Sequence, residues 1–149
     1  MEPRFLEEAI RLAIENVEQD GGTPFGAVIV KNGEIVARGV NEMERSCDPT
    51  AHAELLAIRR ACQKLNTTDL SDCVLYASGE PCPMCLGAIY WANIKEVYFA
   101  YSLKEAERVG LSSAYIYRQI SEQDKDIVYK HVKIDTAQPN PFLIWHEKN

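Results

Sequence analysis

Apolar residues recur at helical spacing near the N-terminus and at strand spacing soon after it. The helical set predicts an amphipathic helix that ends near Gly21-Gly22; its members are Phe5, Leu6, Ala9, Ile10, Ala13, Ile14 and Val17. An apolar run from Phe25 to Val30 then predicts a strand, and Asn32-Gly33 predicts the tight turn of a β-hairpin. Residues 34–40 return as the second strand. The chain is therefore expected to open with a helix and a hairpin.

The middle of the chain alternates helix and strand signals. After a polar loop over residues 41–49, Thr50 is placed to cap a helix that continues to about Leu65. Residues 73–78 are rich in strand formers, and a helix follows with Pro83 in its first turn. Residues 96–101 form the fourth expected strand. This order of strand, helix and strand predicts a right-handed crossover and a parallel pair.

The last third of the chain completes the expected fold. Residues 112–120 predict a helix, and residues 127–134 alternate like a fifth strand. The tail over residues 139–145 carries apolar side chains that need a surface to bury against. The sum is an α/β fold, a three-layer α/β/α arrangement in which helices cover both faces of a five-stranded mixed sheet.

Composition narrows the class of protein. The chain has 149 residues, 46% hydrophobic and 26% charged, which suits a single globular domain over residues 1–149. No apolar run approaches the roughly 18 residues of a membrane span, and the N-terminus does not resemble a signal peptide. The five cysteines are an odd number, so we expect reduced thiols and a cytoplasmic location. A net charge of −6 without a dense basic cluster disfavours nucleic acid and suits a small neutral or cationic substrate.

Two short motifs carry the chemistry. Cys82 and Cys85 are three residues apart, a spacing at which two thiolates can hold one metal ion from the start of a helix. His52 supplies a third ligand, and Glu54 is a carboxylate two residues on. Three protein ligands leave a fourth position for water, which is the catalytic arrangement of zinc. We therefore expect one zinc ion per chain.

The spacing of His52 and Glu54 restricts where the metal can lie. Two residues apart on a regular helix, their side chains point to nearly opposite sides. They converge only if the site lies beyond the end of the helix, so we expect two helix N-termini to face one metal ion. There Glu54 would move protons from the attacking water to the ring nitrogen and the leaving amine.

Alternative readings of these residues stay open. A structural zinc site would require a fourth ligand, for which Cys47 is the candidate, while Cys73 fits a buried strand. Glu80 is expected to orient the cysteine turn. The remaining histidines, His131 and His146, suit surface or packing roles.

Candidate substrate contacts are fewer and less specific. Asn41 precedes the loop into the histidine helix, where an amide could both donate to and accept from a ring edge. A simple turn role fits Asn41 equally well. Phe25 and Trp91 could stack on a planar ring, or belong to the core.

These motifs resemble the cytidine deaminase-like zinc aminohydrolases, in which His-x-Glu is followed by Pro-Cys-x-x-Cys. Within that family the chain is most similar to small bacterial guanine deaminases. The resemblance covers nearly the whole chain and rests on residues 24–30, 48–54, 80–92 and 115–117 and on Pro141-Phe142. It implies a five-stranded sheet between helices, base contacts at Phe25 and Asn41, and a homodimer that exchanges its C-terminal segments, here residues from about 135 to 149.

The same resemblance implies hydrolysis of guanine to xanthine and ammonia, with two departures. The guanine group carries acidic residues just before its Tyr-x-Tyr helix, where this chain has Ser112-Ser113, and its C-terminus is longer. We hypothesise that Ser113, or Ser112, faces the substrate from the neighbouring subunit. A nucleoside such as guanosine, an aminotriazine or a cytosine-type ring remain alternative substrates. Further alternatives are tRNA adenosine deamination and a non-catalytic zinc module.

Overall fold

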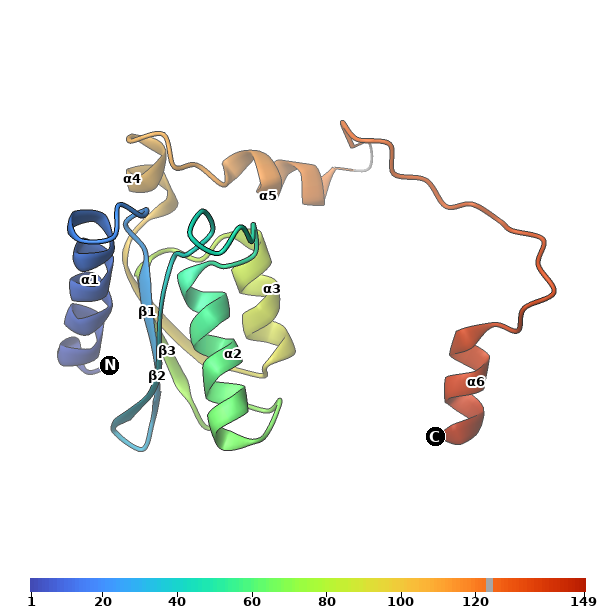
Figure 1. Ribbon diagram of the computed structural model, residues 1–149, viewed down its shortest axis with the longest axis horizontal. Helices are drawn as coiled ribbons and strands as arrows, with labels where there is room; N and C mark the ends of the chain where they lie inside the picture. Colours follow the sequence, from blue (N-terminus) through green and yellow to red (C-terminus); the bar gives the residue numbers. More distant parts are fainter. Residues whose placement is uncertain (123–124) are drawn as a thin grey trace.

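The computed structural model describes residues 1–122 and 125–149 and orders the helices and strands as shown in Figure 1. The first part of the chain forms α1 (Pro3–Glu18), β1 (Gly26–Lys31), β2 (Glu34–Val40), α2 (Ala53–Leu65), β3 (Val74–Gly79), α3 (Pro83–Trp91) and β4 (Glu96–Tyr101). Three short helices follow: α4 (Leu103–Glu107), α5 (Ala114–Ser121) and α6 (Pro141–Lys148).

The sheet is mixed, with strand order β2-β1-β3-β4. β1 pairs antiparallel with both β2 and β3, while β3 and β4 are parallel. The hairpin turn has Asn32 and Gly33 at φ values of 50° and 75°, the left-handed pair that suits a tight hairpin. The predicted hairpin and the predicted parallel crossover are therefore both confirmed.

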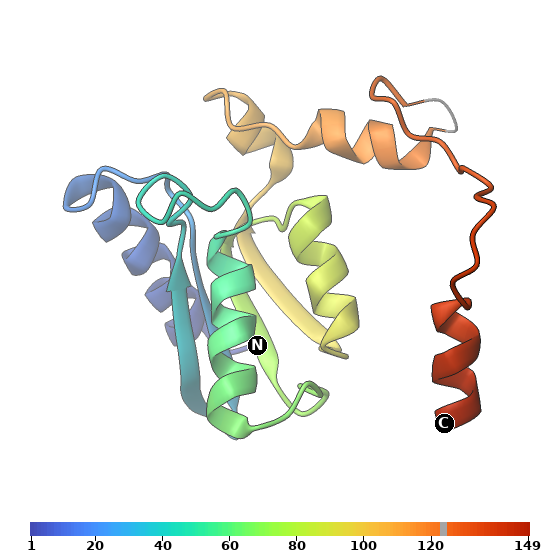
Figure 2. The same cartoon turned by 45° about the vertical axis from the view of Figure 1, so that its right-hand side comes forward.

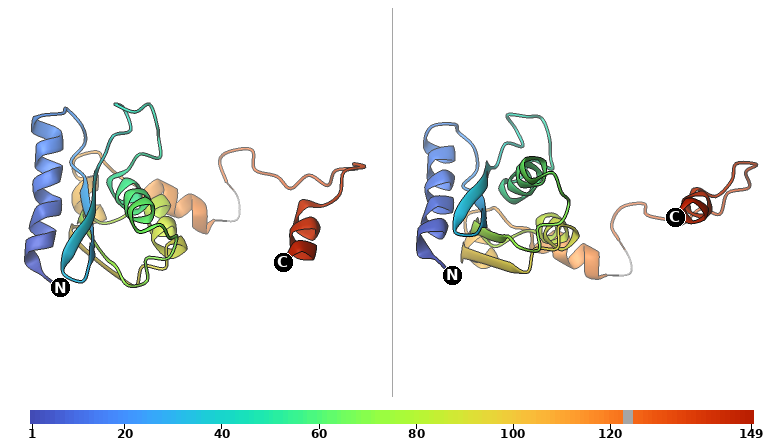
Figure 3. Two further views of the ribbon diagram at one scale, coloured as in Figure 1. Left: turned by 60° about the horizontal axis from the view of Figure 1, so that its bottom comes forward. Right: turned by 90° about the horizontal axis from the view of Figure 1, so that it is seen from below.

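Helices cover both faces of the sheet, so the three-layer expectation is confirmed. α1 lies on one face, and α2 and α3 lie on the other (Figures 1 and 3). β1 shows why both faces are apolar, since its alternate residues serve two clusters. Val28 and Val30 pack with Phe5 of α1, whereas Ala27 and Ile29 join the cluster under α2 and α3.

Gly39 allows α2 to approach the sheet closely. A Cβ atom at Gly39 would collide with the carbonyl oxygen of Ala53 and come within 2.9 Å of the amide nitrogen of Ala57. Because Ala53 begins α2, this contact fixes the start of that helix against β2. The residue just before α2 is His52, so the glycine also helps to place the histidine.

The expectation of a fifth strand is wrong for the residues that the structure describes. Residues 127–134 are assigned to no strand, and all of them are exposed. Strands are held by backbone hydrogen bonds to a neighbour, and alternation alone supplies none. β4 leaves one edge of the sheet free, but this segment runs away from the body of the molecule toward α6 (Figure 2).

Two local expectations also need correction. Thr50 does not cap α2, because His52 is the N-cap residue. Thr50 Oγ1 instead donates a hydrogen bond of 2.7 Å to Asp48 Oδ1. The helix expected over residues 112–120 begins at Ala114, and the tail forms a helix, α6, that the apolar pattern alone did not specify. Within residues 1–122 and 125–149, no helix is both long and apolar enough to cross a membrane.

Candidate active site

Two helix N-termini meet at the predicted metal ligands. His52 is the N-cap residue of α2 and Cys82 that of α3, with Cys85 in the first turn of α3. His52 Nδ1 lies 3.4 Å from the sulfur of Cys82 and 3.5 Å from that of Cys85. The three ligand atoms all lie within 4.8 Å of one another, so the structure brings the expected set together.

The spacing of these atoms fits zinc. In tetrahedral zinc sites the bond to sulfur is about 2.3 Å and the bond to nitrogen about 2.0–2.1 Å. These bonds would place each sulfur about 3.6 Å from the histidine nitrogen. The observed separations of 3.4 Å and 3.5 Å are close to that value. Thiolate and imidazole are ligands that zinc prefers. The cluster can therefore accept the ion with little rearrangement.

Among the described residues, no fourth ligand joins this cluster. Cys47 is exposed on the loop before α2, where its sulfur lies 3.8 Å from the carbonyl oxygen of Glu44. Cys73 is buried in the core as expected, although it lies just before β3, which begins at Val74. The site thus has the open, three-ligand form expected of catalytic zinc, not the closed form of a structural site.

The charges of the ligands are coupled. Hydrogen bonds with Cys85 and His52 hold the pKa of Cys82 well below its ordinary value, although burial opposes the shift. The neighbouring Cys82 sulfur raises the pKa of Cys85, with burial acting in the same direction. A hydrogen bond to Cys82 raises the pKa of His52. A bound dication would favour both thiolates and the neutral imidazole, so binding would release protons.

Glu54 lies in the first turn of α2 and is only 6% exposed. Burial raises the pKa of its carboxyl to about 7. A group with a pKa near neutrality can both accept and release a proton at physiological pH. Because His52 precedes the helix and Glu54 is inside it, the two side chains reach the same cavity despite their two-residue spacing.

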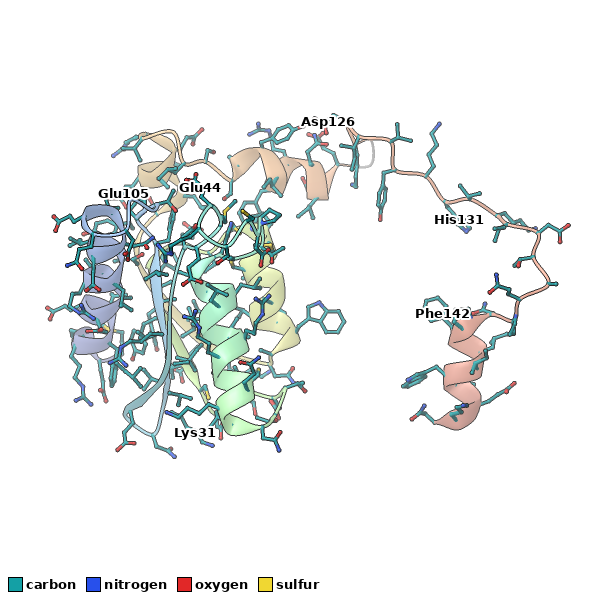
Figure 4. All side chains as sticks on the ribbon, viewed as in Figure 1. Lys31, Glu44, Glu105, Asp126, His131 and Phe142 are labelled. Atoms are coloured by element: carbon teal, nitrogen blue, oxygen red, sulfur yellow. The ribbon has the colours of Figure 1, made fainter. Side chains whose placement is uncertain are left out.

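The cluster opens into a cavity of about 680 Å³. His52, Glu54 and Cys82 form one part of its wall. The rest comes from the loops on either side of β1 and β2 and from the α4–α5 region, including Asp20, Thr23, Phe25, Asn41, Glu42, Glu44, Arg45, Ser112, Ser113 and Ile116. Glu44 marks this end of the molecule in Figure 4, and Lys31 at the hairpin turn marks the opposite end.

Asn41 and Phe25 both line the cavity, as the sequence suggested. Asn41 is 8% exposed, and its Oδ1 accepts a hydrogen bond from the backbone nitrogen of Met43 at 3.1 Å. That bond leaves the amide nitrogen of Asn41 without a partner among the described residues. The turn role and the donor role considered for Asn41 are therefore compatible.

Ser113 and Trp91 have different positions. Ser113 lines the cavity of its own chain, and its hydroxyl is buried without a hydrogen-bond partner among the described residues. Trp91 is 88% exposed at the end of α3 and does not line this cavity. The single chain thus brings Ser113 to the site without a neighbouring subunit, but it does not bring Trp91.

Several contacts near the site were not identified from the sequence. Tyr117 of α5 donates a hydrogen bond of 2.9 Å to the carbonyl oxygen of Pro81, next to the metal ligands. Glu80, which was expected to orient the cysteine turn, lines the cavity, and its Oε1 accepts from the backbone nitrogen of Leu103 at 3.1 Å, at the start of α4. Asn16 is a polar residue on the buried face of α1, and this break in an apolar stripe was a signal that could have been read. His131 and His146 are exposed on the tail, as expected.

Comparisons with known proteins agree with this geometry. A family model for the cytidine and deoxycytidylate deaminase zinc-binding region matches residues 1–101. The chain is 48% identical to guanine deaminase of Bacillus subtilis over 143 residues, which cover 95% of this chain and 91% of that protein. It is also 48% identical to the tRNA-specific adenosine deaminase of Aquifex aeolicus, but over 96 residues, 64% of this chain and 63% of that protein.

Solved structures give the same picture. The crystal structure of the Bacillus subtilis guanine deaminase superposes with a TM-score of 0.93 at 46% identity, covering 99% of this chain and 94% of that one. A guanine deaminase structure from Nitrosomonas europaea superposes with a TM-score of 0.69 at 32% identity, covering 73% of this chain and 63% of that one. Similarity thus extends through the tail for the first structure.

Proposed function

Because the chain belongs to the family of cytidine and deoxycytidylate deaminases, we propose that it is a zinc-dependent deaminase that converts guanine and water to xanthine and ammonia. The observation that carries the proposal is the open cluster of His52, Cys82 and Cys85 beside a buried Glu54. The 48% identity to a guanine deaminase over nearly the whole chain supports guanine as the substrate.

We assign one zinc ion to His52 Nδ1 and the sulfurs of Cys82 and Cys85. When bound, zinc supplies the Lewis acidity that lowers the pKa of water from 15.7 toward about 7. The start of α2 fixes the imidazole, and the start of α3 fixes both sulfurs. Helix N-termini favour negative charge, so the starts of α2 and α3 both help to stabilise the thiolates and the nearby carboxylate.

Glu54 carries the protons. Its carboxylate takes a proton from the attacking water and delivers it to a ring nitrogen, and it then moves the second water proton, now on the new C2 hydroxyl, to the amino group at C2. Water oxygen forms a bond to C2, the bond from C2 to the amino nitrogen breaks, and ammonia leaves. The burial of Glu54 keeps bulk water away from this exchange.

Asn41, Phe25 and Ser113 are the proposed substrate contacts within the chain. The free amide nitrogen of Asn41 can donate to an acceptor on the ring edge. The Phe25 ring can lie against the base face. A χ1 rotation of Ser113 could turn its unpaired hydroxyl toward ring donors, in the place where the guanine group carries an acid.

Other substrates remain as alternatives within this chemistry. A hydroxyl recognises ring donors less strongly than a carboxylate does. The alternative substrates are therefore guanosine, an aminotriazine and a cytosine-type ring. A tRNA substrate is disfavoured by the cavity wall itself. Asp20, Glu42 and Glu44 line it against a single arginine, Arg45, and this acidic balance repels phosphates.

We further propose a homodimer in which the C-terminal segments, from about residue 135 onward, are exchanged. The tail of one chain is exposed and ends in the apolar helix α6, which stands apart from the body in Figure 2. β4 has a free edge, and α3 exposes Tyr90 and Trp91. Trp91 would contact the substrate only in such an assembly.

The five free thiols support a reducing, cytoplasmic location.

The test of the proposed function is ammonia release by the zinc-loaded protein with guanine, guanosine, adenosine, cytosine, cytidine and an aminotriazine. We expect guanine to have the highest kcat/KM. Turnover of another ring without turnover of guanine would support the deaminase assignment but contradict guanine as the substrate. Tight zinc binding with no turnover on any ring would contradict the enzyme assignment.

A further inference from the structure

We propose that Asn16, a buried residue of α1 outside the cavity, is a positioning residue. It holds the cavity rim, the two loops over residues 20–25 and 41–50, in its binding geometry. This inference rests on the proposed function, because it concerns the same cavity. Asn16 is 1% exposed and is not part of the cavity wall. Its side chain instead contacts three residues that are part of the wall.

The amide group of Asn16 links two separate loops to α1. Its Nδ2 donates to the carbonyl oxygen of Thr23 at 2.8 Å and to that of Asn41 at 3.0 Å. Thr23 precedes β1, while Asn41 follows β2, and both residues line the cavity. One side chain therefore sets the relative position of the two loops that flank the hairpin.

The oxygen of the same amide extends the link to a third point. Asn16 Oδ1 accepts a hydrogen bond of 3.2 Å from Arg45 Nη1. The Arg45 guanidinium lies between two acids of the cavity wall, with Nη2 3.4 Å from Glu42 Oε1 and Nη1 3.9 Å from Asp20 Oδ2. Arg45 is thereby held over the rim, where it offsets part of the acidic charge.

The surrounding packing is adapted to this side chain. A Cβ atom at Gly22 would lie 2.5 Å from Asn16 Nδ2, so any larger residue there would have to displace the amide. An apolar residue at position 16 would leave the carbonyl oxygens of Thr23 and Asn41 without this donor. A buried acceptor without a partner carries a cost, so the loops would move to find water. The expected consequence is a rim that no longer presents Asn41 and Arg45 correctly.

The test compares Asn16→Leu, which keeps the branched shape of the side chain but removes all three hydrogen bonds, with Leu6→Ala. Leu6 is a matched control, since it lies on α1, packs into the cluster under that helix and is ten residues from Asn16. Both changes should lower thermal stability. The readouts are kcat and KM on the ring that wild-type protein deaminates fastest, and hydrogen exchange of residues 20–25 and 42–50.

We expect Asn16→Leu to raise KM about tenfold with kcat reduced less than about threefold, because a displaced Asn41 would lose about one hydrogen bond to the substrate, and one such bond alters affinity by about that factor. Exchange of the two rim loops should accelerate, while Leu6→Ala leaves KM and rim exchange unchanged. Equal KM and equal rim exchange in the two variants would overturn the proposal and leave Asn16 with a purely structural role.

A second variant covers the case in which Asn16→Leu does not fold. Arg45→Ala removes one hydrogen bond of the link from a partly exposed position, so folding should survive. It should raise KM and accelerate exchange of residues 42–50, and unchanged exchange there would overturn the proposal. A failure of guanine as the proposed substrate can be told apart from a failure of this proposal. The ammonia-release test on wild-type protein decides the substrate, and it does not affect the hydrogen-exchange measurement.

Discussion

Glu54 shows how the setting of one residue determines what its carboxylate can do. Burial raises its pKa to about 7, and the first turn of α2 points it into the cavity with His52. A carboxylate on the outer face of the same helix would have neither property. The role proposed for Glu54 therefore depends on its position at the helix start.

Replacing Glu54 with Gln should separate metal binding from catalysis. The variant keeps size and hydrogen-bonding capacity but cannot carry a proton, so kcat should fall by about 10²–10⁴-fold. Zinc content by elemental analysis should remain near one per chain, because Glu54 is not in the ligand cluster. Near-normal turnover in this variant would remove Glu54 from the proton path.

Ser113 should influence which ring is preferred. The change Ser113→Asp places a carboxylate in the cavity wall, where it can accept from two ring donors more strongly than a hydroxyl does. We expect the ratio of kcat/KM for guanine to that for cytosine to rise at least about tenfold, since charged hydrogen bonds are worth roughly 1.5–3 kcal/mol. Ser112→Asp tests the alternative serine, which is exposed and also lines the cavity. An unchanged ratio in both would place neither serine against the substrate.

At the scale of elements, the site depends on how closely α2 and α3 approach the sheet. Each helix contributes ligands from its N-terminus, so a shift of either helix separates the sulfur and nitrogen atoms. Gly39 gives α2 its close contact with β2. A residue far from the chemistry thus controls the metal geometry through the position of a helix.

Gly39→Ala tests this link. The new methyl group would collide with the backbone of α2, so we expect a loss of about 1–3 kcal/mol in the free energy of unfolding. Zinc should also be held more weakly in a chelator competition, because His52 moves with the helix. Gly87→Ala on α3 is the control, since its Cβ would meet no atom within 4 Å. Equal zinc affinity in both variants would show that α2 adjusts without moving the histidine.

Glu8 joins α1 to the edge of the sheet through charge. Its carboxylate accepts from Arg11 at 2.6 Å and from Arg38 of β2 at 3.3 Å. The hydrogen bond from Arg11, followed by that from Arg38, lowers the pKa of Glu8 below its ordinary value of 4.5, although burial opposes the shift. The folded protein therefore binds this proton less tightly than the unfolded chain does.

The expected pH dependence follows from that direction. A lowered folded-state pKa contributes stability above the unfolded-state value, and the contribution disappears as pH falls through the folded-state pKa. Glu8→Gln should lower the free energy of unfolding by at most about 1 kcal/mol at pH 7, as for partly exposed pairs. The difference from wild type should shrink in denaturant titrations as pH falls below the unfolded-state pKa of about 4.3. A difference that does not shrink as pH falls would point to lost packing and not to charge.

At the scale of the whole molecule, the tail is the part that the single chain does not use. Phe142 and Trp145 are exposed, and Figure 4 shows Phe142 and His131 well away from the body of the protein. Exposed aromatic residues on a short helix need a partner surface to be stabilised. The proposed exchange between two copies would supply that surface.

Truncation after residue 134 should therefore change the assembly. Full-length protein is expected to be a dimer by light scattering, and the truncated chain a monomer with a weaker affinity for substrate. The zinc content should stay the same, since every ligand lies before residue 86. A truncated protein that remains dimeric with unchanged KM would remove the tail from both the interface and the site.

The sequence by itself determined the chemistry and most of the layers. Spacing decides whether Cys82 and Cys85 can share a metal ion, and the need for His52 and Glu54 to converge placed the site beyond a helix end. The alternating apolar residues of β1 and the Asn32-Gly33 turn likewise specified a hairpin with two buried faces. These features depend on local geometry, which short stretches of sequence encode directly.

Only the tertiary structure decided features that join distant parts of the chain. Residues 127–134 alternate like a strand, yet they form none among the described residues, because pairing requires a neighbouring strand as well as a pattern. Asn16 contacts Thr23, Asn41 and Arg45 only after α1 packs on the sheet. Trp91 was expected near the substrate, but the length of α3 carries it away from the cavity. Such positions depend on how elements pack, and local patterns contain no information about distance between elements.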